Sequence, residues 1–499
     1  MTVLGASTTR VRDPADRLSP IRSILYVVGM LLMMLGAVMM VPALLDVADH
    51  SAEWRGFFVS GASSIFFGGT LFFSNRTASF RLAARHGYLL TTLSWLSVSA
   101  FSALPYIAGE TDLAPVDAFF EAMSGLTGTG ATVISGLDSL PRGILLWRAL
   151  TNWMGGIGIV VMAIVMLPFL RIGGMQLFRT ESTERSDKPM ARTSQLAAAT
   201  ALAYLALSVL CAIALFAGGM GWFDAICHAM ATLATGGFST KDASIGYFNS
   251  AVIQWIEVAF MTAGALPLVF FVRLATQGRR ALGRDAQIRW FLTALAVAVV
   301  ALTAWTWLVK GMAFGSAFTL SAFHVTSVMT DTGFWSTDIG GWGPFAVALL
   351  FLLYFVGGCA GSTAGSIKVF RWKILFATAV LQLRRMLEPN GVFVARYGGA
   401  PISDDVRESV RSFFFAYMLT FAVFTLVLSA TGLDFLASAA VVAEAMANAG
   451  PALGSAAGPA NGFAYLSDPA KWALALAMLL GRLELFTVYV LLVPRFWRW

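Results

Sequence analysis

The chain has 499 residues, of which 58% are hydrophobic and only 12% are charged, and its mean hydropathy is +0.74. These values exclude an ordinary soluble protein and predict an all-α polytopic membrane protein. The net charge of +7 would suit a nucleic-acid-binding protein, but the placement of the basic residues, described below, argues against nucleic acid as a partner. Cys211, Cys227 and Cys359 have no metal-type spacing, and we expect free thiols.

Apolar runs long enough to cross a bilayer, which takes about 20 residues, follow one another along the chain. The first two predict an N-terminal pair of transmembrane helices in residues 1–80, and we expect no cleavable signal because the first run is too long. Four pore repeats are predicted next, each with a span, a short re-entrant helix, a glycine turn and a second span. The repeats occupy 81–190, 191–285, 286–395 and 396–499; the expected spans are 24–45, 56–73, 87–107, 144–170, 196–217, 251–274, 290–309, 345–381, 412–430 and 472–493.

The basic residues test this topology. With the N-terminus in the cytosol, 27 of the 34 lysines and arginines fall on the cytosolic side, as the positive-inside rule requires. Both termini are then cytoplasmic and the glycine turns face outward. The basic charge is thus mainly a topology signal, and it could also hold anionic lipid or an acidic partner surface. The exceptions are Arg482, within a span, and the residues of outer loops, Arg55, Arg142, Arg148, Lys241, Lys310 and Lys471.

One short segment recurs four times, each time between two long apolar runs. Its copies centre on Gly130, Gly237, Gly333 and Gly450 and read DAFFEAMSGLTGTGATVI, DAICHAMATLATGGFST, SAFHVTSVMTDTGFWST and AVVAEAMANAGPALGS. Four weak repeats in a membrane chain indicate one supersecondary unit used four times. The alternative for any single copy is a membrane helix packed through small residues.

A glycine turn at membrane depth is tolerated only where protein buries it or where it lines water. Glycine lets the carbonyl turn inward, and rings of carbonyl oxygens can replace the hydration shell of an alkali cation. The negative C-terminal end of each short helix also favours a cation. The candidate filter residues are Thr127, Gly128, Thr129, Gly130, Thr235, Gly236, Gly237, Asp331, Thr332, Gly333, Asn448, Ala449 and Gly450.

The second span of repeat three contains a glycine-rich stretch that weakens a helix. We interpret it as a flexible loop that occludes the pore below the filter; close helix packing through GxxxG pairs is the alternative. The candidate gate residues in it are Gly357, Gly358, Gly361, Ser362, Thr363 and Gly365.

A charged residue lies within the last span. Arg482 is costly there and by default functional, and a fixed positive charge below the filter would repel a resting cation. The alternative is a structural role, paired with Glu484 or with carbonyls freed by a broken helix. Residues two apart do not face each other on a helix, which makes Glu484 a poor partner.

Polar side chains also lie near the turns. Glu121, His228 and His324 share one aligned position, nine residues before the glycine, which suggests a common structural role rather than ion ligation. Asp331 lies next to a filter glycine and could raise the local cation concentration, and Glu444 lies near the fourth turn.

Laid out in this way, the chain resembles the Trk/Ktr/HKT superfamily of potassium transporters. SGLTGTGATVI, ATGGFST, TDTGF and NAGP resemble its four filter segments, GGCAGSTAGSIKVFRWK its intramembrane gating loop, and GRLELFTVYVLL its last inner helix with the pore arginine. The two extra N-terminal spans resemble the TrkH/TrkG type. At Gly128 this chain has glycine where the resemblance leads us to expect threonine.

The resemblance implies potassium uptake by a homodimer in the bacterial inner membrane, with K⁺ as the transported ion and one pore in each subunit. It also implies a cytosolic TrkA-like ring of nucleotide-binding subunits. The chain itself has no P-loop and no GxGxxG after a strand, so we expect no nucleotide site in it.

Two other functions compete with a gated potassium pathway. A proton-coupled potassium or sodium symporter would need intramembrane acids or histidines in a relay, and the sequence offers few. A membrane-embedded enzyme would need a cluster of acids, metal ligands or an activated nucleophile on one membrane face. The sequence shows no such cluster, and we expect a protein that is not an enzyme.

Overall fold

The computed structural model describes residues 14–76, 84–109, 111–166, 189–278, 285–450 and 462–497. Those residues form a helical bundle, and the one sheet among them is a two-stranded hairpin of β1 (Arg396–Tyr397) and β2 (Ala400–Pro401). Parts of the sequence predictions lie outside the described residues: the end of the fourth repeated segment, 451–455, the end of the 144–170 span, and many cytosolic basic residues in 1–13, 77–83, 167–188 and 279–284.

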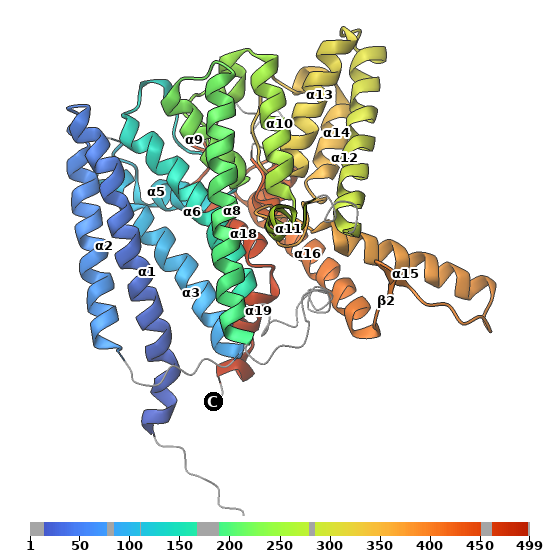
Figure 1. Ribbon diagram of the computed structural model, residues 1–499, viewed down its shortest axis with the longest axis horizontal. Coiled ribbons are helices and arrows are strands. Elements are labelled where there is room, and N and C mark those ends of the chain that lie inside the picture. The colour runs from blue at the N-terminus through green and yellow to red at the C-terminus, as the bar shows by residue number, and fades with distance from the viewer. Residues whose placement is uncertain are drawn as a thin grey trace, which may run out of the picture.

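Two long helices, α1 (Pro14–Ala48) and α2 (Trp54–Ser74), form the predicted N-terminal pair at one edge of the bundle (Figure 1). They pack through small residues, because a Cβ at Gly29 would lie 2.6 Å from the carbonyl oxygen of Gly68. The pair is tied to the rest of the chain by Arg142, which donates to Asp49 just after α1. That hydrogen bond lowers the pKa of Asp49.

The rest of the chain repeats one unit four times. Each unit has an outer helix, a short pore helix and a second, inner segment, as the sequence predicts. The units are α3 (Ala84–Ser102) with α4 (Leu104–Ala108), α5 (Pro115–Thr127) and α6 (Arg142–Met166); α8 (Pro189–Ala217), α9 (Trp222–Leu233), α10 (Ala251–Ala265) and α11 (Leu268–Gln277); α12 (Ala286–Ala304), α13 (Phe314–Met329), α14 (Pro344–Leu353) and α15 (Val369–Leu387); and α16 (Asp404–Ala430), α17 (Phe435–Ala447), α18 (Asp468–Arg482) and α19 (Phe486–Leu492).

Short helical turns complete the described structure. A π-helical turn, η4 (Trp305–Val309), extends α12. The 3₁₀ turns are η1 (Leu137–Ser139), η2 (Ser244–Phe248), η5 (Gly340–Trp342) and η6 (Pro494–Trp497).

The second spans of repeats two, three and four are broken; the sequence analysis expects the break only in repeat three, at the glycine-rich stretch. The axes of α10 and α11 differ by 94° and those of α18 and α19 by 115°. In repeat three a non-helical stretch, 354–368, separates α14 from α15. Helix α15 projects from the side of the bundle (Figure 1). Pro267 stands at the first break, and Glu484 and Leu485 have positive φ at the last.

The long helices have the lengths and surfaces of membrane spans. Among the described residues, six helices are long and apolar enough to cross a bilayer, or up to eight if each bent pair is one span. Only 28–44% of the residues in their most apolar windows are buried within the chain. The remaining apolar side chains therefore face outward, where lipid can cover them.

Candidate functional site

All four pore helices end in the same turn. One or two residues after each helix, a residue has left-handed φ: +67° at Gly128, +50° at Thr235, +60° at Asp331 and +58° at Asn448. The next backbone N–H then reaches back over the last turn, as in a Schellman motif. These hydrogen bonds run from Thr129 N to Ser124 O (2.9 Å), Gly236 N to Ala231 O (2.8 Å), Thr332 N to Ser327 O (2.9 Å) and Ala449 N to Glu444 O (3.2 Å).

This turn explains the residue at Gly128. The sequence comparison with the superfamily leads us to expect threonine there, but the position requires the left-handed conformation, which glycine adopts most readily. A Cβ at Gly128 would meet no atom closer than 3.5 Å. The left-handed backbone conformation explains the glycine at this site, whereas a lack of room for a side chain does not.

The four filter glycines lie against one another in a closed ring. A Cβ at Gly130 would lie 2.7 Å from Gly236 O, and one at Gly450 would lie 2.8 Å from Thr129 O. A Cβ at Gly237 or Gly333 would overlap the carbonyl oxygen of the next segment, Thr332 O or Gly450 O. Each repeat therefore touches the next through backbone, and the fourth touches the first. The four turns therefore form one closed ring of backbone contacts.

Side chains in the filter brace the turns. The hydroxyls of Thr127 and Thr129 lie 2.8 Å apart, and those of Thr330 and Thr332 lie 2.8 Å apart in the third repeat. Asn448 Nδ2 donates to Thr129 Oγ1 (3.0 Å) and so joins the fourth repeat to the first.

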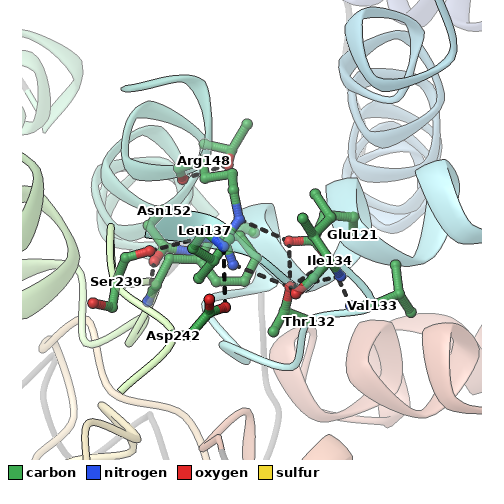
Figure 2. A network of polar contacts seen from close by, with 12 residues as sticks. Glu121, Thr132, Val133, Ile134, Leu137, Arg148, Asn152, Ser239 and Asp242 are labelled. Atoms are coloured by element: carbon green, nitrogen blue, oxygen red, sulfur yellow. Dashed lines mark hydrogen bonds and ion pairs between the residues drawn. The ribbon is translucent and has the colours of Figure 1, made fainter. Parts of the chain in front are cut away.

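A buried ion pair within the first repeat also bonds to the second repeat (Figure 2). Arg148 on α6 donates from Nε to Glu121 Oε1 (2.9 Å) and from Nη1 to Ser239 O (2.7 Å). Glu121 also accepts from Thr132 Oγ1 and from the backbone N–H of Val133 (2.9 Å). Arg148 is 1% exposed, so its assignment to an outer loop is wrong: it is a buried span residue whose charge is balanced by Glu121.

A second residue of α6 connects the same two turns. Asn152 donates from Nδ2 to Gly125 O (2.8 Å) in the first pore helix and accepts at Oδ1 from Phe238 N (3.1 Å), next to the second filter glycine. Sequence reasoning missed both Arg148 and Asn152, which lie one helical turn apart on α6. That spacing of two polar side chains in an apolar span is the signal that could have found them.

The aligned position before the glycine has a structural role in three repeats. Glu121 bonds to Val133 N, His228 Nε2 lies 2.9 Å from Ser239 Oγ, and His324 Nε2 lies 3.3 Å from Ser336 Oγ. In each case the side chain bonds to the non-helical segment that follows the glycine. The sequence interpretation of this position is confirmed.

The glycine-rich stretch forms a loop pressed against the underside of the ring. Thr363 Oγ1 donates to Leu233 O (2.9 Å) at the end of the second pore helix. A Cβ at Gly365 would overlap Ala447 O at the end of the fourth. The loop also fills the break in repeat two: Cys359 N donates to Ala265 O (2.9 Å), and Leu268 N donates to Gly361 O (3.0 Å). Backbone groups freed by the α10–α11 bend are thereby satisfied.

Arg482, at the end of α18, bonds to this loop. Its Nη1 donates to Thr363 O (2.7 Å) and its Nη2 to Gly155 O of α6 (3.3 Å), and the residue is 3% exposed. Glu484 pairs with Arg371 instead, at 2.5 Å. Of the structural alternatives, pairing with Glu484 is thus wrong, and bonding to backbone carbonyls is what Arg482 does.

A cavity of about 70 Å³ lies beneath the loop. Its wall is mainly apolar, and Arg482 and Lys368 contribute basic groups to it. The wall also includes Gly361, Ser362, Gly365, Glu484 and Thr487.

Comparison with known proteins shows which family has this architecture. The chain matches the family described as "Cation transport protein" TrkH over residues 54–498. It belongs to the TrkH family. It is 42% identical to the Trk system potassium uptake protein TrkI of Halomonas elongata, over 99% of this chain and 100% of that protein. It is 39% identical to TrkH of Escherichia coli K12, over 96% and 99%. The crystal structure of the potassium transporter TrkH from Vibrio parahaemolyticus is similar with a TM-score of 0.89 and 36% identity, covering 96% of this chain and 100% of that one.

Family membership confirms two sequence predictions. The superfamily resemblance is correct, and the all-α membrane architecture matches a solved TrkH. The family is one of transport proteins, and the relatives are named as transporters, not as enzymes.

Proposed function

We propose that this TrkH-family chain takes up potassium through the ring of four filter segments. The observation that carries the proposal is the closed contact of Gly130, Gly237, Gly333 and Gly450 around one axis. Four pore helices end at this ring, so their negative ends favour a cation there. Main-chain oxygens at such a ring can replace the water around a dehydrated potassium ion. Relatives along nearly the whole chain are named for potassium uptake.

The ion would be held by the segments Thr127–Gly130, Thr235–Gly237, Asp331–Gly333 and Asn448–Gly450. Within these segments or directly beside them, the hydroxyls of Thr127, Thr129, Thr330 and Thr332 bond to each other or back to their own helices. The carbonyl oxygens of the turns are therefore the groups left to face an ion.

The loop and Arg482 would form the gate. The loop blocks the path below the filter, and the guanidinium holds the loop through Thr363 O. A fixed positive charge at this point also raises the energy of a potassium ion that leaves the filter. Opening then requires the loop to move away from the pore-helix ends and from Arg482.

Arg482→Ala should raise basal potassium flux about tenfold, the change expected when a barrier falls by about 1.4 kcal/mol. The variant loses both the positive charge and the hydrogen bond that holds the loop. Flux into proteoliposomes, measured without any partner subunit, is the readout. Arg482→Lys retains the charge and should give a smaller rise. A variant that fails to fold, judged by size-exclusion chromatography in detergent, would instead support a purely structural role.

Assembly and regulation follow from the resemblance to the superfamily. The chain would form a homodimer in the bacterial inner membrane with both termini in the cytosol. A TrkA-like nucleotide-binding ring would bind its cytosolic face and control the gate, because the chain has no nucleotide motif of its own. Co-purification with such a ring, and a nucleotide-dependent flux only in its presence, would test this arrangement.

Proton-coupled symport is the second candidate, and buried carboxyl groups favour it. Glu257, Asp331 and Glu444 are fully buried near the pore helices, and each has at least one oxygen without a hydrogen-bond partner among the described residues. Acids in such positions can take part in a proton relay. A reversal potential that follows the potassium gradient alone supports the channel-like pathway, whereas one that shifts with pH supports coupling.

Growth of a potassium-uptake-deficient bacterial strain at low potassium tests the proposed function. The chain, expressed with and without a regulatory partner, should restore growth, and added sodium should not replace potassium. Expression without rescue under either condition would contradict the proposal.

A further inference from the structure

The third pore helix ends in the same turn as the other three but carries an acidic side chain there. In its terminal turn the left-handed residue is Asp331, which is fully buried. At the same position Gly128 has no side chain, Thr235 Oγ1 donates to Ala234 O, and Asn448 Nδ2 donates to Thr129 Oγ1 and Met478 O. Neither carboxylate oxygen of Asp331 has a partner in ordinary hydrogen-bond geometry within the described part of the chain. A buried carboxylate without hydrogen bonds is costly unless nearby charges compensate it.

The carboxylate points at the loop and not at the ion path of its own turn. A Cβ at Gly357 would lie 3.1 Å from Asp331 Oδ2. The backbone amides of Gly358 and Gly365 interact with the carboxylate outside ordinary hydrogen-bond geometry and favour its negative charge. Asp331 thus lies against the first two residues of the loop and one near its end.

Those residues form the neck of the loop. Gly357 pairs with Lys368 in an isolated bridge, with Gly357 N donating to Ile367 O (3.1 Å). Val369 N donates to Gly358 O (3.2 Å) on the other side. The neck brings the Lys368 ammonium, which donates to Ala364 O, to the buried side of the loop. A charge placed at the neck acts on both ends of the loop at once.

Asp331 compensates two buried cations at the neck, because both Lys368 and Arg482 interact with it. Glu484, which is paired with Arg371, also acts on Lys368. The tyrosines Tyr354 and Tyr417 are the other titratable groups that Asp331 affects. Without Asp331, Lys368 would keep only the shared Glu484 and Arg482 would keep no carboxylate among the groups that act on it, which is strongly unfavourable for buried charges.

We propose that Asp331 is a positioning residue that holds the loop closed beneath the filter by balancing the buried charges of Lys368 and Arg482. This inference rests on the proposed function in treating the loop as the gate. In this proposal Asp331, a residue of the third filter segment, connects the filter to the gate. A change in the third filter turn then moves the loop, because Asp331 is part of the turn and touches the loop neck.

Loop exposure tests this role independently of flux. Ser362 lines the cavity below the loop, so Ser362→Cys, in a chain that carries Cys359→Ala, reports opening to a membrane-impermeant thiol reagent added on the cytosolic side. Asp331→Asn should raise the labelling rate about tenfold, since the closed loop loses its compensating charge. Glu257→Gln removes another fully buried carboxyl, which bonds to Thr232 and has no loop residue among the groups that act on it, and it should leave labelling unchanged.

A double variant sharpens the test. Lys368→Met removes one of the two cations that attract Asp331 and the hydrogen bond to Ala364 O within the loop, and it should raise labelling. Asp331→Asn combined with Lys368→Met should label more slowly than Asp331→Asn alone, because one uncompensated cation is gone. If Asp331→Asn does not fold, the rise in Lys368→Met remains as the test. Labelling that is the same in Asp331→Asn and the parent, with flux altered, would overturn the proposal and assign Asp331 to the ion path. A parent chain that labels as expected but transports no potassium would overturn the proposed function and not this contact.

Discussion

Gly333→Ala should abolish growth rescue at low potassium. Gly333 has φ of +82°, and an added Cβ would overlap the carbonyl oxygen of Gly450 in the next filter segment. The strain of a non-glycine residue at positive φ is roughly 1–2 kcal/mol, and the overlap must in addition push two segments apart. Because the ring closes through each glycine in turn, a displacement at one contact alters the spacing of carbonyl oxygens around the ion.

Two other glycines serve as controls for this substitution. Gly69→Ala on α2 adds a Cβ with no atom within 4 Å and should grow like the parent. Gly128→Ala has comparable backbone strain but no overlap, so it should lose less growth than Gly333→Ala. The ratio of potassium to sodium flux in proteoliposomes falls if selectivity is lost, and it stays the same if the variant only yields less folded protein. If Gly333→Ala kept both growth and ion preference, the filter assignment would be wrong.

Arg148→Met should destabilise the protein by about 3–5 kcal/mol, because it leaves the buried carboxylate of Glu121 without its cation. Glu121 is 0% exposed and cannot turn to water. The variant also loses the hydrogen bond to Ser239 O that joins the first repeat to the second. Thermal unfolding in detergent should occur at a lower temperature, and growth rescue should fall with it.

Removing both charges should cost less than removing one. Glu121→Gln with Arg148→Met leaves no unpaired buried charge, so its unfolding temperature should lie above that of Arg148→Met alone. Arg407→Met, which breaks an ion pair to Asp404 whose side chain is 85% exposed, should change stability little. Equal stability of Arg148→Met and the parent would show that the Glu121–Arg148 pair does not support the filter.

Much of the site could be predicted because its signals are local. Gly130, Gly237 and Gly333 have positive φ and stand where a side chain has no room, so glycine recurs at fixed distances from each pore helix. The pore helices are short apolar segments between long apolar runs. Both features can be read from neighbouring residues alone.

Other parts of the site depend on residues far away in the chain. Arg148 was assigned to an outer loop because its partner, Glu121, is visible only once α5 and α6 pack together. Glu484 was considered as a partner for Arg482, but it bonds to Arg371 more than a hundred residues earlier. Charge pairing across repeats leaves no periodic pattern in the sequence.

The sequence by itself determined the membrane class, the four repeated units and the glycines at their turns, because chain hydropathy and backbone conformational freedom are properties of short segments. Only the tertiary structure decided that the second spans of repeats two and four also break, and what occupies the break in repeat two. The bend between α10 and α11 is possible because the loop of the following repeat supplies hydrogen bonds to Ala265 O and Leu268 N. Backbone groups in a bilayer must be satisfied by some partner, and here that partner comes from another part of the chain.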